Sequence, residues 1–152
     1  MASQLSQVLT HIIEVYDAMP LVNTITVNFT DIIDESKENI YPLVNITLLA
    51  SPSPLQDLRE FVFEFTILNQ RDDAKVATTS KLLSDINYID NIGIADSIAN
   101  NFILEVLKTH NVLDINIVED SVSEFDPLKS DERNNLDGIK FNATFSIHQN
   151  DI

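Results

Sequence analysis

The chain has 152 residues, the usual length of one folded domain, and it contains no cysteine and no tryptophan. Without cysteine, disulfide bonds and thiolate metal sites are excluded. The 24 acidic and 9 basic residues give a net charge of −15, which disfavours sequence-specific binding to nucleic acid and binding to anionic membranes, because both need cationic side chains.

The beginning of the sequence shows no feature of an export signal or a membrane anchor. Met1 to Gln4 carry no basic side chain, and Glu14 and Asp17 interrupt the apolar residues that follow. No stretch approaches the roughly 18 apolar residues that a transmembrane helix needs. We therefore expect a soluble protein that is not exported by a cleaved signal.

A helix and a strand are the first elements that the sequence predicts. In residues 3–18, apolar side chains recur every three or four positions, which is typical of an amphipathic helix. Ser3 can cap the start of this helix, and Pro20 ends it. Residues 24–30 then alternate between apolar and polar side chains, which predicts a first strand.

Two more strands are predicted in the first half of the chain. Residues 43–50 form the second, and Pro52 and Pro54 end it because proline cannot donate a hydrogen bond to a neighbouring strand. Residues 57–69 form the third. One face of this third strand carries a row of phenylalanines, namely Phe61, Phe63 and Phe65.

The second half of the chain predicts a helix and two strands. Asp90 is the predicted N-cap of a helix that runs to His110. Residues 112–118 predict a fourth strand. Residues 139–148 alternate between apolar and polar side chains throughout, so they predict the last strand.

Three polar segments connect these elements, at 31–40, 70–88 and 119–138. The second and third exceed the usual connection of roughly 4–6 residues, which is typical of functional loops. A short helical turn is predicted around 76–84.

The predicted order is therefore α-β-β-β-α-β-β, in one domain over residues 1–152. Two helices that each have one apolar face must bury it against a sheet, and the two-layer arrangement satisfies this need. We expect an α+β fold, with a mixed or antiparallel sheet of about five strands and both helices packed on one face.

The polar residues of the chain do not form a recognisable catalytic or metal-binding motif. The three histidines, His11, His110 and His148, lack the spacing of metal ligands, and each is interpreted as structural or solvent-facing. The two glycines are too few for a phosphate-binding loop. We therefore expect no enzyme activity, no cofactor and no metal.

The layout of the chain resembles the small tail-terminator and head–tail connector proteins of tailed bacteriophages. The similarity covers most of the chain and rests on the order of its helices and strands and on the residue pattern within them. It comprises the helix at 3–18, the paired strands at 41–46 and 61–67, the helix at 90–110 and the terminal strand that begins at Gly138.

This resemblance implies a structural protein of the virion, found in the neck or tail and assembled in the host cytoplasm. Such a protein forms a homo-oligomeric ring, hexameric or of higher order, around the DNA channel. Its partners would be copies of itself and neighbouring neck or tail proteins. DNA would pass through the ring without specific binding, and no catalytic residue is implied.

Charged residues in the three polar segments are the candidates for inter-subunit contacts or for the channel wall. Acidic side chains on an inner wall would keep DNA from adhering, because bound phosphates need cations. These candidates are Asp31, Asp34, Glu35, Glu38, Arg71, Asp72, Asp73, Glu119, Asp120, Glu124, Asp131 and Glu132.

Two other functions are compatible with the sequence. The first is an acidic protein that mimics DNA, or an adaptor, bound to a partner that handles nucleic acid; the net charge of −15 suits it. The second is a small enzyme with two convergent carboxylates in an acidic cleft, which ranks well behind the other two.

Overall fold

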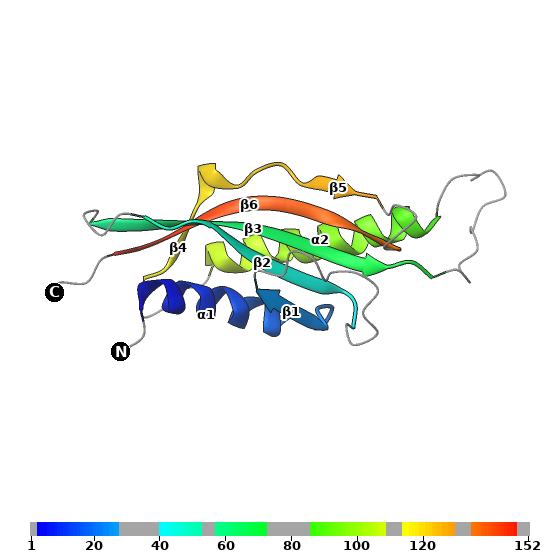
Figure 1. The fold of residues 1–152 in the computed structure, drawn as a ribbon, viewed down its shortest axis with the longest axis horizontal. Helices are drawn as coiled ribbons and strands as arrows, with labels where there is room; N and C mark the ends of the chain where they lie inside the picture. Colours follow the sequence, from blue (N-terminus) through cyan, green and yellow to red (C-terminus); the bar gives the residue numbers. More distant parts are fainter. Residues whose placement is uncertain are drawn as a thin grey trace.

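The computed structural model describes residues 3–27, 40–52, 57–72, 86–108, 114–129 and 135–148. Two helices, six strands and one 3-10 turn are described (Figure 1). They are α1 (Gln4–Asp17), β1 (Thr24–Val27), β2 (Leu43–Ala50), β3 (Leu58–Gln70), α2 (Ile86–Lys108), β4 (Asn116–Val118), η1 (Glu119–Ser121), β5 (Asp126–Leu128) and β6 (Leu136–His148).

The strands form one mixed sheet in the order β1-β2-β3-β6-β4, and β5 also pairs with β6. The β1–β2 pair is parallel, whereas the other described pairs are antiparallel. The longest strands, β3 and β6, lie side by side along the length of the molecule (Figure 1). The α+β fold predicted from the sequence is confirmed.

The register between β3 and β6 brings their apolar rows together. Phe61 pairs with Phe145, and Phe65 pairs with Phe141. Because side chains alternate along a strand, both rows lie on the same face of the sheet. Burying each of these rings contributes about 1.5–3 kcal/mol, so this pair of strands is the base of the core.

Both helices cover that face, as the sequence predicts. The helix α1 buries Val8, Ile12 and Tyr16, and α2 buries its own stripe, which includes Phe102. The rings of Tyr16 and Phe102 are stacked, with centroids 4.1 Å apart. The predicted cap is also confirmed, because the Ser3 side chain accepts a hydrogen bond from the backbone N–H of Ser6.

Some predicted boundaries are wrong. The second helix begins at Ile86, ahead of Asp90, because its first turns are held by polar contacts to the end of β3 rather than by a cap at Asp90. The predicted loop at 119–138 contains η1, β5 and the start of β6, so six strands of the sheet lie in the described residues. The predicted helical turn at 76–84 and His110 lie outside the described residues.

The edge of β6 explains the additional strand. The strand β4 pairs with the residues 144–146, and β5 pairs with 138–140. Between them, the hydroxyls of Ser121 and Ser123 accept hydrogen bonds of 2.8 Å from the backbone N–H groups of Thr144 and Asn142. The chain thus satisfies the backbone of β6 along this edge, which an open loop would not do.

Candidate functional site

The two lateral borders of the sheet differ in structure and charge. One border is β1, a parallel strand of four residues without a charged side chain. The other is the interrupted β4–η1–β5 segment, in which exposed carboxylates follow one another. These carboxylates belong to Glu119, Asp120, Glu124 and Asp126.

The face of the sheet opposite the helices is mixed in polarity. On β3 it carries Val62, Glu64 and Thr66, which are partly exposed, and on β6 it carries Lys140 and Asn142. Within the described part of the chain, no helix lies on this face (Figure 1). Only part of this face is accessible to a second molecule, because Leu43 and Leu68 on the same face are buried.

A buried polar network joins the end of the sheet to the start of α2. Asp137 on β6 and Asn91 on α2 are both fully buried, and the Asn91 amide donates to Asp137 Oδ2 at 3.1 Å. The Arg71 guanidinium contacts Asp137 Oδ1 at 2.9 Å, and the Asn69 amide donates to Asn91 Oδ1 at 3.0 Å. Each side chain orients the next one, so this network fixes α2 on the sheet.

The candidate residues chosen from the sequence fall into three groups. Arg71 belongs to the network, and the backbone N–H of Asp72 donates to the Asn87 side chain at 2.8 Å. Glu119, Asp120 and Glu124 lie together on the β4–η1–β5 border. The others lie outside the described residues, namely Asp31, Asp34, Glu35, Glu38, Asp73, Asp131 and Glu132.

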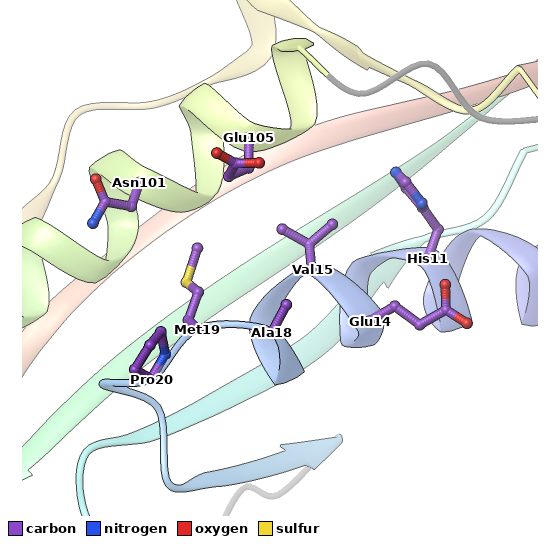
Figure 2. A pocket seen from close by; sticks show the side chains of 8 residues that line it. All are labelled: His11, Glu14, Val15, Ala18, Met19, Pro20, Asn101 and Glu105. Carbon is purple, nitrogen blue, oxygen red and sulfur yellow. The ribbon is translucent and has the colours of Figure 1, made fainter.

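A groove of about 580 Å³ separates α1 from α2. Figure 2 shows Val15 of α1 and Met19, which follows α1, pointing toward α2. Asn101 and Glu105 of α2 lie on the other wall. The remaining lining residues are His11, Glu14, Ala18 and Pro20. The groove therefore combines an apolar strip with two carboxylates.

His11 and Glu14 are neighbouring titratable side chains on the α1 wall of the groove. Burial lowers the pKa of His11 below its usual value, because the charged form loses hydration, while the neighbouring Glu14 carboxylate raises it in part. The lowered pKa favours the neutral form of His11.

The described residues form neither a metal site nor a membrane-spanning helix. In the parts of the chain that the structure describes, no group of three or more histidine and acidic side chains is placed to hold a metal ion. His148 lies 3.7 Å from Asp114 in an exposed pair at the end of β6, far in sequence from His11. Neither described helix is long and apolar enough to cross a bilayer.

Sequence reasoning missed the groove and the network. The signal for the network was Asn91, a polar residue inside the apolar stripe of the second helix. The groove carried no such signal, because it arises from the spacing of two helices that are far apart in the chain. Comparison with protein-family models finds none that matches this chain, and comparison with curated proteins finds no match.

Proposed function

We propose that this chain is a structural protein of a tailed bacteriophage virion, which assembles into a homo-oligomeric ring around the DNA channel. It would act as a tail terminator or as a head–tail connector. The proposal rests on the resemblance in element order and on one structural observation, namely that the two borders of the sheet are unlike.

Unlike borders matter because of the geometry of rings. In a ring, each subunit uses one patch to contact a different patch on its neighbour, whereas a two-fold dimer uses the same patch twice. The neutral β1 border and the acidic β4–η1–β5 border are two such different patches on opposite sides of one plate. The contact that we propose joins β1 of one subunit to the β4–η1–β5 border of the next.

The charge of the chain suits a DNA channel. With a net charge of −15, a ring of identical subunits would repel phosphates at short range. Exposed carboxylates that lie away from the contacts between subunits can line the passage. DNA would then move through without adhering, because adhesion depends on cationic side chains.

Cysteine cross-linking tests the proposed contact directly, since the natural chain has no cysteine. Val27→Cys places a thiol on the β1 border, and Glu124→Cys places one on the other border. We expect each variant alone to stay uncross-linked on oxidation, a mixture of both to give covalent dimers, and the double variant to give a ladder of multimers. Native mass, measured by light scattering, should match the ring.

The matched control pairs Glu124→Cys with Leu58→Cys. Leu58 is as exposed as Val27, at 39% each, but it lies on the interior strand β3. This pair should not cross-link above background. Self-cross-linking of Val27→Cys would instead indicate a two-fold dimer, and a monomeric mass at all concentrations, with no cross-links, would contradict the ring. Detection of the chain in purified phage particles tests its place in the virion.

The acidic border also favours one second candidate. Four exposed carboxylates within residues 119–126 are a surface that a DNA-binding protein could contact in place of phosphates. Such an acidic mimic or adaptor would remain a monomer and bind a nucleic-acid-handling protein in a salt-sensitive manner. The mass measurement separates this candidate from the ring.

A further inference from the structure

From the exposed side chains of α2 we infer an apolar contact between ring subunits, in which the outer flank of α2 packs on the uncharged surface around β1 of the next copy. The outer flank is defined by Ile89, Leu104 and Leu107, and the uncharged surface by residues 18–27 and 40–50. The inference rests on the proposed ring and deepens it, because it names the side chains that hold neighbouring subunits together beside the two sheet borders.

The outer flank of α2 carries large apolar side chains that are exposed to solvent. Ile89, Leu104 and Leu107 have exposed fractions of 48%, 44% and 46%. Ile89 and Leu107 are 18 positions apart (107 − 89), which is about five helical turns, so they lie on the same side of α2. Leu107 lies about 200° around the helix from Glu105, a residue of the groove, so this side faces away from α1. Exposed apolar side chains that share one surface are typical of a contact site.

The uncharged surface around β1 is also rich in exposed apolar side chains. Residues 18–27 and 40–50 contain no aspartate, glutamate, lysine or arginine. They hold four of the eight large apolar side chains that are exposed in the described part of the chain, namely Leu21, Val27, Ile40 and Leu49. The other four are Leu58 and the three residues of the outer flank. Because the centre of a lasting interface is apolar and poor in charges, this composition suits a contact with another protein molecule.

The charges of the two surfaces favour a second copy as the partner. Asp96 is exposed and follows Ile89 by seven positions, about two helical turns, so the outer flank carries a carboxylate. The β4–η1–β5 border carries four more, and α2 contacts β4. These carboxylates meet no like charge on the uncharged surface, whereas the acidic side of another copy would repel them. Copies with a net charge of −15 can therefore associate through their unlike sides.

The most exposed side chains of the two surfaces lie near the same end of the sheet. Ile89 is two positions before Asn91, whose side chain donates to the second residue of β6. The backbone N–H of Ile40 donates to the Thr24 hydroxyl at 3.3 Å. The pairing of β1, β2, β3 and β6 places Thr24 level with the third residue of β6. Subunits placed side by side would therefore bring Ile89 and Ile40 together without a shift along the strands.

Polar variants of the outer flank test whether it holds the ring. Leu104→Gln with Leu107→Gln removes apolar surface, and glutamine favours a helix about as well as leucine. The chain concentration at which half of the subunits are in rings, measured by light scattering, should rise at least about tenfold, because less apolar area leaves water at each contact. The matched control is Leu58→Gln, which changes an exposed leucine outside both surfaces. It should shift this concentration by less than about twofold.

Cross-linking tests which side chains meet. A mixture of Ile89→Cys and Ile40→Cys chains should give covalent dimers with a short bis-maleimide reagent, since the two sites lie near the same end of the sheet. The matched control replaces Ile40→Cys by Leu49→Cys. Leu49 is as exposed as Ile89, at 48% each, but its neighbour Leu48 is level with Ala143, about 17 Å further along the sheet than Thr24. The control mixture should give few dimers.

The outcomes separate the contact of the outer flank from the ring itself. Assembly that the two glutamines leave unchanged, or equal cross-linking with Ile40→Cys and Leu49→Cys, would overturn the flank contact and leave the ring standing. Self-cross-linking of Ile89→Cys alone would show two α2 helices meeting about a two-fold axis, which also overturns it. A monomeric mass at all concentrations, with no cross-link between Val27→Cys and Glu124→Cys, would overturn the ring and the flank contact together.

Discussion

The sheet holds α2 by two different kinds of contact, one at its centre and one at its end. At the centre, the ring of Phe65 lies 5.2 Å from Phe102 and 5.1 Å from Phe141, measured between centroids. At the end, Asn91 of α2 is bound by Asn69 and Asp137 through hydrogen bonds. At the centre, α2 is held by the apolar area that the rings bury. At the end, it is held by hydrogen bonds and charges, which depend on the direction of each side chain.

The difference predicts how each region responds to change. Apolar packing is not directional, so its contribution scales with the buried area and the cavity that a substitution leaves. A buried polar network depends on all its members, because a donor or a charge that loses its partner cannot return to water. Damage at the centre should be graded, and damage at the end should be cooperative.

The largest effect is expected at the centre. Phe65→Ala should lower the free energy of unfolding by about 3–5 kcal/mol, because it opens a cavity among five aromatic neighbours of the core. Phe65→Leu should cost clearly less, since leucine refills part of the space. Urea unfolding followed by circular dichroism measures both. Equal losses would contradict a graded response.

A smaller but cooperative loss is expected at the end of the sheet. Asp137→Ala should cost about 3 kcal/mol, because it removes the buried carboxylate that Arg71, which is only 17% exposed, contacts at 2.9 Å. The double variant Arg71→Met with Asp137→Leu should cost less than the sum of the two single changes. The double-mutant cycle from urea unfolding gives the coupling, and strict additivity would show that the network is not a unit.

Substitution of the two glycines of the chain by alanine should change the stability in opposite directions. At Gly138 an added Cβ would overlap the backbone carbonyl oxygen of Ile67 on β3, so Gly138→Ala should cost about 1–3 kcal/mol. At Gly93, in the exposed part of α2, an added Cβ meets no atom within 4 Å, so Gly93→Ala should stabilise the protein by about 0.5–1 kcal/mol. Thermal unfolding of the two variants should shift in opposite directions.

A small effect is expected at a polar atom in the apolar centre. Tyr16 is fully buried, its hydroxyl has no hydrogen-bond partner among the described residues, and burial raises its pKa well above the usual value. Tyr16→Phe should therefore raise the free energy of unfolding by about 1 kcal/mol while keeping the ring stacked on Phe102. A loss of stability in urea unfolding would indicate that the hydroxyl is satisfied.

The same contrast explains what the sequence could predict. The helix at 4–17 and the long strands at 58–70 and 136–148 follow from local periodicity, so their existence was predictable to within a few residues. The strand β5 was not, because Asp126, Pro127 and Leu128 show no strand pattern, and they pair only because β6 has an edge to satisfy.

The sites were harder to predict than the fold. Asp137 and Arg71 are 66 positions apart, and no sequence pattern around either residue indicates that the two side chains pair. The groove depends on Glu14 and Glu105, which belong to two helices whose spacing is set by the stacked rings of Tyr16 and Phe102. Of the acidic residues chosen from the sequence, Glu119, Asp120 and Glu124 do share one border.

The position of β6 inside the sheet has a consequence for synthesis. This strand comes last among the described elements, yet it lies between β3 and the β4–η1–β5 border and pairs with β3 over 13 residues. As the chain leaves the ribosome, β3 therefore cannot complete its pairing with β6 until residue 148 has emerged. Completion of the sheet must follow translation of residue 148, and nascent chains on one messenger carry an open strand edge until then, which chaperones would need to shield.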